Sequence, residues 1–313
     1  MRVKSTPTIV DVARAAGVSK SLVSLAIRND RGVSEATRHR ILQVAEEIGY
    51  RSNHWARSLV AGRTGLIGVL LNELGNPHNT DVVEAVEDVA AQDGLGVVVS
   101  HGRRDPSILA QRLQAMRQLG LDGFVVVSAH VPGGELRAAA QQAPTVVIAN
   151  PYELPENVSQ VRNDDASGAR QAVEHLLARG HTRIGFLAAS ESRTTRVRAQ
   201  AYEDVMAEHD LEASVWRDGA AVFTGERPSA VFASNDRAAA RLLGSAADKG
   251  VDVPGELAIV GYDDAELASV VRPQLTTVAQ PRAAMGQRAM EILLSGAVER
   301  VVVEPTLVVR SSS

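Results

Sequence analysis

Near the N-terminus, residues 8–24 read TIVDVARAAGVSKSLVS, and this stretch predicts a helix, a tight turn and a second helix. Thr8 can cap the first helix, because its hydroxyl can accept a hydrogen bond from a backbone N–H of the first turn. Gly17 ends that helix, since glycine adopts a left-handed backbone without steric cost, and Ser19 begins the next one. Small residues at the crossing allow the close packing of a helix-turn-helix unit. The residues expected to face its core are Ile9, Val12, Ala13, Ala16, Leu22, Val23 and Ala26.

A third helix is expected to complete a small N-terminal domain. Ser34 can cap it, Glu35 places an acid in its first turn, and Gly49 stops it. A core built from three short helices is small, so such a domain is only marginally stable alone. The residues expected on the buried side of the third helix are Ile41, Leu42, Val44, Ala45 and Ile48.

The charge of the chain is unevenly distributed. Residues 1–63 contain eleven Lys and Arg against five Asp and Glu, a net charge of +6, whereas the whole chain carries −4 and the remainder therefore −10. A basic unit joined to an acidic one is typical of a polyanion-binding module attached to a domain that does not bind nucleic acid. Charge alone would equally suit a solvated basic helical domain. The helix-turn-helix pattern favours DNA.

From residue 66 onward, apolar runs alternate with amphipathic stretches. Residues 66–71 read LIGVLL, as expected of a strand buried on both faces. The alternation occurs in two series, which predicts two parallel α/β units with a ligand cleft outside the carboxyl ends of their strands. The expected strands are 66–71, 96–100, 123–128, 145–149, 183–188, 230–233 and 257–261. The expected helices are 80–92, 106–119, 134–142, 166–179, 195–209, 236–249 and 285–294, with an extended end at 301–309.

Several motifs in fixed order resemble the LacI/GalR family of bacterial transcription regulators. They include the stretch 8–24, VSEATR at 33–38, IGY at 48–50 and GYDD at 261–264. The resemblance covers nearly the whole chain. It implies an α/β protein with a three-helix helix-turn-helix head (1–50), a hinge helix and linker (51–64), and a two-lobed body of the periplasmic-binding-protein type I kind (65–313). That body would bind an effector and dimerise.

The resemblance also implies three passages of the chain between the two lobes. We expect them near 150–165, near 262–275 and close to the last strands. The first lobe would then comprise about 65–150 and 262–280, and the second about 163–261 and 281–313. Between Tyr202 and Asn235 the chain is shorter than is usual in the family. A helix before the strand at 230–233 is therefore expected to be missing or vestigial, which thins the flank of the second lobe.

The second helix is expected to read DNA bases. In helix-turn-helix proteins its first residues reach base edges in the major groove, and here Lys20, Ser21 and Ser24 face outward, with Arg28 as a further DNA contact. Lysine can donate to guanine O6 and N7, and serine can bond to either kind of edge. At Leu25 readout should be weak or favour a thymine methyl. The serines have helix capping as an alternative role. Contacts that set the register on phosphates are expected from Thr8, Ser19, Ser34, Thr37, Tyr50 and Asn53.

Residues 51–60 resemble the hinge segment of the family. Asn53 can cap a short helix there, and Ala56 and Arg57 match the same motif. A helix this short does not persist alone in water. In the family it folds against its dimer mate on DNA and wedges a leucine into the minor groove, which by position is Leu59. The alternative is an inert linker in which Leu59 packs on the body.

Polar residues at two expected strand ends and after a family motif point to a ligand site in the cleft. Asn72 follows the strand at 66–71, Asn150 follows the strand at 145–149, and Gln280 follows LTTV at 275–278. His78 stands where the family frequently has an aromatic residue stacked on the ligand. The loop can therefore still bond a polar ligand, while stacking of a side-chain ring on the ligand is weakened.

Three further residues match effector-binding positions of the family: Arg198, Asn235 and Asp263. Guanidinium, carboxamide and carboxylate groups can each bond vicinal hydroxyls in pairs, so a sugar or sugar derivative is the expected ligand. A nucleobase or a phosphosugar remains open. The alternative role of Arg198 and Asp263 is an ion pair that merely ties the two lobes.

The sequence disfavours an enzyme. The absence of cysteine excludes disulfides, cysteine-ligated zinc and thiol catalysis. Neither a Gly-x-Ser-x-Gly nor a Gly-x-x-x-x-Gly-Lys motif occurs, and the histidines form no metal-spaced pair on one helix face. We expect no catalytic residue, metal or cofactor.

A transport receptor with the same body fold is the other rival, but the basic head and the lack of a signal-peptide pattern argue against it. No apolar run long enough to span a membrane occurs. We therefore expect a cytoplasmic repressor that binds palindromic double-stranded operator DNA as a homodimer. The dimer surface would come from the helices at 80–92 and 236–249.

Overall fold

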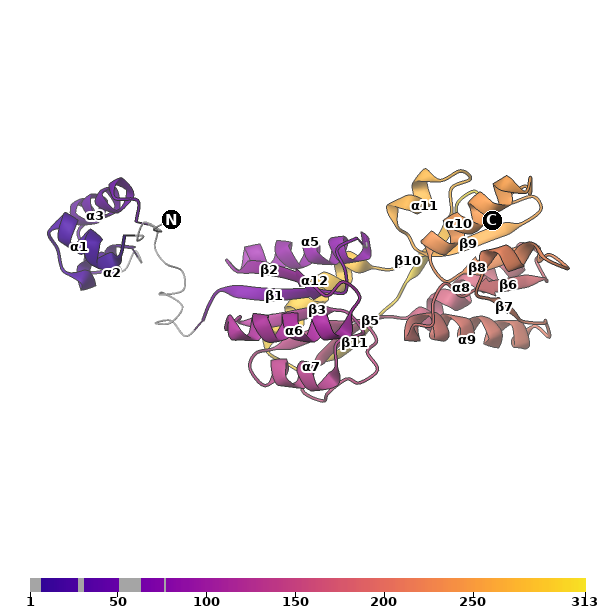
Figure 1. The fold of residues 1–313 in the computed structure, drawn as a ribbon, viewed down its shortest axis with the longest axis horizontal. Helices are drawn as coiled ribbons and strands as arrows, with labels where there is room; N and C mark the ends of the chain where they lie inside the picture. The colour runs from indigo at the N-terminus through magenta and orange to yellow at the C-terminus, as the bar shows by residue number, and fades with distance from the viewer. Residues whose placement is uncertain (1–6, 28–30, 51–62, 76) are drawn as a thin grey trace. The chain divides into compact units, whose positions relative to one another are not determined.

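The computed structural model describes residues 7–27, 31–50, 63–75 and 77–313. The chain divides into two compact units, residues 1–64 and residues 65–313 (Figure 1). Within the described ranges, no helix combines the length and apolarity that crossing a membrane requires.

The N-terminal unit is a three-helix bundle. Its core is centred on Val12, Val23 and Ile41, none of which exposes any surface. Gly17 ends the first helix with a φ of +64°, as its role in the turn predicts. The predicted burial of Leu42 is wrong, because this residue is 46% exposed; it follows Ile41 by one position and so faces about 100° away around the helix. The helices are α1 (Ile9–Ala16), α2 (Lys20–Ile27) and α3 (Glu35–Glu47).

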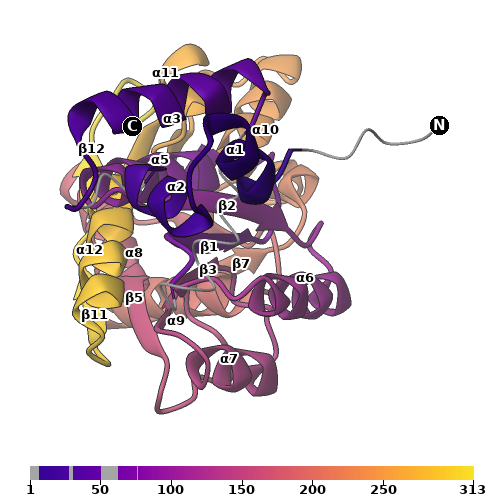
Figure 2. The ribbon, with the colours of Figure 1, turned by 90° about the vertical axis from the view of Figure 1, so that its left-hand side faces the viewer.

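The first lobe of the larger unit contains a six-stranded parallel sheet in the order β11-β5-β4-β3-β1-β2. Alternate residues of the strands pack against helices α5 and α12 on one face and against α6 and α7 on the other. Figure 2 shows α12 and α6 on opposite sides of this sheet. The strands are β1 (Leu66–Leu71), β2 (Gly96–His101), β3 (Gly123–Val127), β4 (Thr145–Ile148), β5 (Ser159–Asn163) and β11 (Arg300–Val303). The helices are α5 (Pro77–Gln92), α6 (Pro106–Gln118), α7 (Gly133–Ala140) and α12 (Arg282–Ser295).

The second lobe contains another six-stranded sheet, in the order β12-β10-β9-β8-β6-β7. It is parallel except for β12, which pairs with β10 antiparallel. Helices α8 and α9 cover one face, and α10 and α11 with the short turn η1 cover the other. The strands are β6 (Ile184–Leu187), β7 (Ser214–Trp216), β8 (Ala230–Ala233), β9 (Ala258–Asp263), β10 (Thr276–Ala279) and β12 (Thr306–Val308). The helical elements are α8 (Asp165–Ala178), α9 (Arg193–Glu208), η1 (Gly219–Phe223), α10 (Asp236–Asp248) and α11 (Glu266–Val270).

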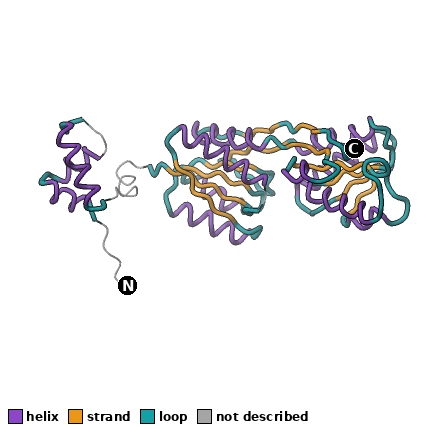
Figure 3. Tube along the Cα trace, turned by 90° about the horizontal axis from the view of Figure 1, so that it is seen from above, coloured by secondary structure: helices purple, strands orange, loops and turns teal. Residues whose placement is uncertain are grey.

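The predicted assignment of residues 262–303 to the lobes is reversed, whereas residues 304–313 belong to the second lobe as predicted, because β12 pairs with β10. Residues 262–280 belong to the second lobe, because β10 pairs with β9 there. Helix α12 packs with α5 on the first sheet, and β11 extends that sheet beside β5. The lobes therefore comprise about 65–163 with 281–303, and 164–280 with 304–313. Figure 3 traces the two lobes and the segments that connect them.

The three passages of the chain lie between β5 and α8, between β10 and α12, and between β11 and β12. The first and last fall where they were expected. The second lies later than the expected 262–275, because the strand at 276–279 was not foreseen. Its first two residues, Thr276 and Thr277, are polar and nevertheless fully buried.

The shortened segment between Tyr202 and Asn235 forms a three-residue edge strand, β7, and the single turn η1. This agrees with the expectation of a vestigial helix. Trp216 closes the end of β7 by lying over Gly185 of β6, where a β-carbon would overlap its ring. The turn η1 packs on α10 and covers the face of that helix that lies towards the shortened segment.

Candidate DNA-binding surface and effector site

The start of α2 has the geometry expected of a recognition helix. The Ser19 hydroxyl caps it by accepting a hydrogen bond from the Leu22 backbone N–H at 3.2 Å. Lys20 and Ser21 are exposed, whereas Val23 is fully buried and anchors the helix to the core. Ser24 and Leu25 are half-buried. The first turn of α2 therefore offers an ammonium and a hydroxyl to a partner.

The starts of α1 and α3 carry the predicted phosphate contacts. Ser34 caps α3 by accepting from the Thr37 N–H at 3.3 Å, and the two hydroxyls lie 2.8 Å apart. At α1, the backbone N–H and hydroxyl of Thr8 both donate to Asp11, at 2.8 and 2.7 Å. These bonds lower the pKa of Asp11. Exposed helix N-termini of this kind favour anions.

Tyr50 is half-buried and packs against the core of the head. The remaining predicted DNA contacts lie outside the described residues: Arg28, Asn53, Ala56, Arg57 and Leu59.

A cavity of about 290 Å³ lies between the two lobes of the larger unit. The first lobe contributes the ends of β1, β3 and β4, and the second contributes α9 and the ends of β8 and β9. The side chain of His78 lies outside the part of the chain that the structure describes. The other predicted effector residues all line this cavity: Asn72, Asn150, Arg198, Asn235, Asp263 and Gln280.

Arg198 is the centre of the polar network in the cleft. It is 4% exposed, and its Nε and Nη2 donate to one carboxylate oxygen of Asp165 at 3.0 and 2.7 Å. Its guanidinium carbon lies 3.4 Å from the centre of the Tyr262 ring, and Nη1 donates to the Ser234 carbonyl at 2.6 Å. Burial opposes the charged form of Arg198, but Asp165, Tyr262 and Asp263 together outweigh this and hold its pKa above the ordinary value.

The alternative role of Arg198 and Asp263 as a tie between the lobes is not supported. Both belong to the second lobe, and the nearer carboxylate of Arg198 is that of Asp165, since Asp263 is 3.8 Å away. The Asp263 side chain is 29% exposed and accepts a hydrogen bond from Gln280 Nε2 at 2.6 Å. Its φ of +115° holds it in a strained backbone conformation, as occurs at binding sites. Removal from solvent raises its pKa.

Asn235 and Asp236 have different tasks. Asn235 caps α10 with its side-chain oxygen, which accepts from the Ala238 N–H at 2.8 Å, so its amide nitrogen remains for a ligand. Asp236 is 1% exposed. Its carboxylate accepts from the Thr277 hydroxyl at 2.5 Å and from the Ala265 N–H at 2.8 Å. Burial raises the pKa of Asp236 to about 7.

Sequence reasoning missed Asn163 and Asp165. The Asn163 amide nitrogen donates to Asp165 at 3.0 Å and to the Tyr262 hydroxyl at 2.7 Å. The side-chain oxygens of Asn163 and Asn72 are buried in the cleft without a hydrogen-bond partner among the described residues. Both oxygens can accept from a ligand hydroxyl. Asn163 is the last residue of β5, and the pair Asp164-Asp165 follows it directly; because this polar strand was not expected, its end was not recognised as part of the cleft.

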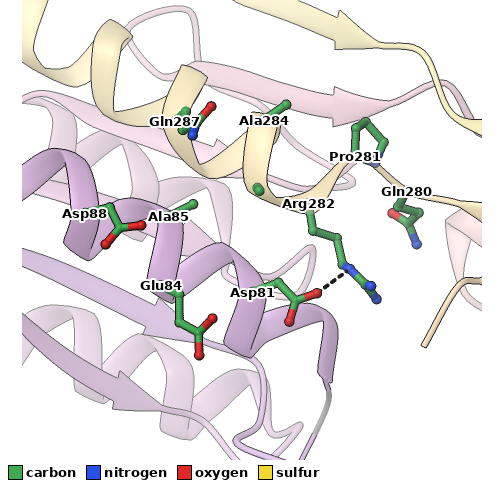
Figure 4. Close-up of a pocket in the computed structure, with 10 residues that line it drawn as sticks. Asp81, Glu84, Ala85, Asp88, Gln280, Pro281, Arg282, Ala284 and Gln287 are labelled. Carbon is green, nitrogen blue, oxygen red and sulfur yellow. Dashed lines mark ion pairs between the residues drawn. The ribbon is translucent and has the colours of Figure 1, made fainter. Parts of the chain in front are cut away.

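Next to the cleft, a second cavity of about 470 Å³ lies between α5 and α12. Figure 4 shows Arg282 reaching Asp81 from the start of α12. The Arg282 Nε lies 2.8 Å from the Asp81 carboxylate, and Nη2 donates to the Asp264 carbonyl at 3.0 Å. Because Asp264 belongs to the second lobe, Arg282 joins the two lobes beside the effector cavity.

Among the described residues, no cluster of three or more His, Cys, Asp and Glu is arranged to hold a metal ion. The cleft instead presents amides, hydroxyls, two arginines and two carboxylates, a set that suits hydrogen bonding to a neutral polar ligand.

Comparisons with known proteins agree with both halves of the chain. A family described as bacterial regulatory proteins, lacI family, matches residues 8–53, and a periplasmic binding protein-like domain matches residues 173–313. The HTH-type transcriptional regulator GalR of Escherichia coli (strain K12) is 33% identical over 97% of this chain and 95% of its own length.

Two solved structures extend the likeness to the fold. The lac repressor dimer bound to operator and the anti-inducer ONPF has a TM-score of 0.85 at 25% identity, over 98% of this chain and 99% of that one. The complex of the transcriptional regulator CelR with cellobiose has a TM-score of 0.71 at 28% identity, over 98% and 100%. These relatives are named as regulators and not as enzymes. With its helix-turn-helix head and two-lobed body, this chain belongs to the lacI family of bacterial regulatory proteins.

Proposed function

We propose that this protein is a repressor that binds a palindromic operator as a homodimer and that a sugar or sugar derivative in the interlobe cavity changes its affinity for DNA. The observation that carries the effector half is the buried polar network of the cleft. There, Arg198 and Asp263 face the amides Asn72 and Asn163, whose side-chain oxygens have no partner in the described part of the chain.

The charge of the cleft favours hydroxyl groups over a phosphate. Two arginines line the cavity: Arg198 is already neutralised by Asp165 at 2.7 Å, and Arg162 is half-buried. Asp263 adds a second carboxylate to the same cavity, so the two carboxylates balance the two arginines and leave no excess positive charge for a phosphate. Carboxylates repel a phosphate but accept hydrogen bonds from sugar hydroxyls. A neutral sugar is therefore favoured over a phosphosugar.

The DNA-binding half of the proposal rests on α2. We propose that Lys20 and Ser21 contact base edges, supported by Ser24 and Leu25, while Thr8, Ser34 and Thr37 contact phosphates. Two copies are needed, because one head reads only a few base pairs and a two-fold dimer reads two half-sites. The dimeric lac repressor on its operator supports this arrangement by analogy.

The coupling between the two halves is proposed to run through closure of the lobes. A ligand that bonds Asn72 and Asn150 in the first lobe and Asp263 in the second binds the closed state better than the open one, and only such a difference in affinity can shift the equilibrium. Three hydrogen bonds that cross between the lobes would respond to closure. They join Arg282 to Asp264, Arg193 to the Pro151 carbonyl at 2.7 Å, and Arg196 to the Tyr152 hydroxyl at 2.9 Å.

The proposal is tested in two steps. A thermal-shift screen of sugars and nucleobases on the full chain identifies the effector, because a ligand that binds only the folded state raises its melting temperature. Fluorescence anisotropy with genomic DNA fragments then measures operator affinity with and without that ligand. Specific DNA binding that no sugar affects would contradict the effector half, and sugar binding without DNA binding would contradict the regulatory half.

A further inference from the structure

The turn that carries Asp263 is held firmly by the second lobe. Asp263 and Asp264 both have positive φ, +115° and +50°, a conformation that persists where the surroundings impose it. The carboxylate of Asp264 lies 2.6 Å from Arg310 Nη2, and the Ala265 N–H donates to the buried Asp236 at 2.8 Å. The turn therefore moves with the second lobe and not independently of it.

Arg282 links this turn to the first lobe. It is the first residue of α12, just after the second passage of the chain between the lobes, and its side chain is 13% exposed. Its Nη2 donates to the Asp264 carbonyl at 3.0 Å, while its Nε lies 2.8 Å from the Asp81 carboxylate on α5 (Figure 4). One guanidinium thus bridges the effector-binding turn and a helix of the first lobe.

The two ends of this bridge respond differently to a change in the angle between the lobes. Helices α12 and α5 are in close contact, since a β-carbon at Gly286 would lie only 2.8 Å from the Val82 carbonyl oxygen. Arg282 and Asp81 therefore both belong to the packed layer of the first lobe. The bond to Asp264 crosses between the lobes, so closure acts on the guanidinium through this bond.

The Arg282 guanidinium is incompletely paired in this arrangement of the lobes. Its Nη1 is buried and has no hydrogen-bond partner in the described part of the chain, and a buried donor without a partner costs free energy. Its charge also reaches the effector carboxylate, because burial raises the pKa of Asp263 and Arg282 is among the groups that oppose this rise. A different angle between the lobes can pair this nitrogen and give the guanidinium a second arrangement, as a coupling element requires.

Helix α5 would be sensitive to such a change. Between residues 77 and 92 it contains four acidic residues and neither Lys nor Arg, and Arg282 provides a positive charge beside it at Asp81. We expect α5 at the dimer surface, where two-fold symmetry places the same patch of both copies together. A weaker pairing of Asp81 would then increase the repulsion between like charges of the two copies.

We propose that Arg282 is a positioning residue that couples the effector site to α5: when closure moves the turn at Asp263 and Asp264, the guanidinium turns with it and its ion pair with Asp81 changes. The inference rests on the proposed function, because it requires a sugar bound at Asp263 and an operator bound by the head.

The test measures how strongly a sugar changes operator affinity. The probes are glucose, galactose, ribose, fructose, cellobiose and lactose, and the sugar that the wild type binds most tightly is used for every variant. Isothermal titration calorimetry gives its affinity for the full chain. Fluorescence anisotropy gives the affinity for the genomic fragment that the wild type prefers, with and without saturating sugar. The ratio of the two operator affinities is the coupling factor.

Arg282→Gln removes the charge at the centre of the bridge. The coupling factor should fall from the range of about 5–150-fold that is typical of allosteric proteins towards one. Sugar affinity should stay close to that of the wild type, because Arg282 is not among the described residues that line the effector cavity. Operator affinity without sugar should also persist. Asp81→Asn keeps the bond to Asp264 but removes the ion pair, and it should lower the coupling factor as well.

Two matched controls separate coupling from a general loss of charge. Arg288→Gln removes another arginine of α12, which pairs with Glu291 at 2.9 Å and Glu299 at 2.6 Å within the first lobe. Asp93→Asn removes an exposed acid just after α5. Both controls should keep the coupling factor of the wild type.

The outcomes separate the inference from the proposed function. An unchanged coupling factor in Arg282→Gln or in Asp81→Asn overturns the inference and leaves the sugar-responsive repressor in place. An equal loss of coupling in Arg288→Gln overturns it too, as does a loss of sugar binding in Arg282→Gln, which would make this residue an effector contact. If no sugar changes the operator affinity of the wild type, the effector half of the proposed function fails and the role of Arg282 fails with it.

Discussion

Arg198 and Asp263 are not equally suitable for mutagenesis, because Arg198 holds the buried polar network together and Asp263 does not. Truncation of Arg198 would leave Asp165 buried without its cation, which typically costs about 3–5 kcal/mol of stability. Asp263 is partly exposed, and its main partner is the amide of Gln280. A substitution at Asp263 therefore reports on the ligand with less disturbance of the fold.

We expect Asp263→Asn to weaken the effector response and to leave operator binding intact. The change removes a charge-assisted hydrogen bond to the ligand, worth about 1.5–3 kcal/mol, and none of the proposed DNA contacts is altered. The midpoint of effector titration against operator-bound protein measures this. Asp93→Asn, at an exposed position at the end of α5, is the control. An unchanged midpoint for Asp263→Asn would place the ligand elsewhere.

Lys20→Ala should relax the sequence preference of the head. A base contact contributes about 1–3 kcal/mol of discrimination, whereas Arg57→Ala, at a proposed phosphate contact, should weaken binding to all sequences and lower the salt dependence. Competition between operator and random DNA at several salt concentrations distinguishes the two effects. An operator preference that survives Lys20→Ala would show that α2 is not the recognition helix.

Asp236 should make the protein less stable as the pH rises. Its folded-state pKa of about 7 lies above the ordinary value of 3.8, so between these values the folded state holds a proton that the unfolded state has lost. Stability then falls with increasing pH by up to about 1.4 kcal/mol per pH unit. Urea unfolding at pH 5, 6, 7 and 8 should show this fall in the wild type and a flatter profile in Asp236→Asn. Parallel profiles would mean that Asp236 keeps its charge throughout.

At the scale of elements, prediction from the sequence succeeded where the local pattern was strong. The strand at 66–71 and the helix starting at 236 were placed correctly, because a continuous apolar run and a capped amphipathic run determine them locally. β5 and β10 were missed. Their polar residues, such as Asn163 and Thr277, pair on one side with strands distant in sequence, β11 and β12, which local patterns do not reveal.

The residues of the candidate site were likewise predicted only in part. Arg198 and Asp263 were found from family motifs, whereas Asn163 ends the unforeseen β5 and Asp165 follows it, so neither could be placed at the cleft. The position of an element in the fold determined whether its polar residues were recognised as part of the site.

The edge of the second sheet provides a stability test for the shortened segment. Gly185→Ala should destabilise the protein by about 1–3 kcal/mol, because the added methyl group overlaps the Trp216 ring and forces β7 away from β6. The midpoint of urea unfolding measures this, with Gly134→Ala at an open helical position as the control. Equal stability of the two variants would mean that Trp216 moves freely and does not hold the edge strand in place.

For the whole molecule, we expect a dimer that uses the exposed faces of α5 and α10. Sedimentation of the free protein and of its complex with a palindromic operator should give two chains in each. The result that would refute this is a stable monomer at micromolar concentration that still binds a palindrome tightly, because one head cannot occupy both half-sites.

The last two strands of the chain belong to different lobes, and this has a consequence for folding during synthesis. β11 forms the outer edge of the first sheet and β12 the outer edge of the second, so both sheets receive an edge strand only when residues 300–308 leave the ribosome. Until then, β5 and β10 expose unpaired backbone groups, which can pair with a neighbouring chain and cause aggregation. A nascent chain stalled before residue 300 would therefore be a natural substrate for a chaperone that covers open strand edges.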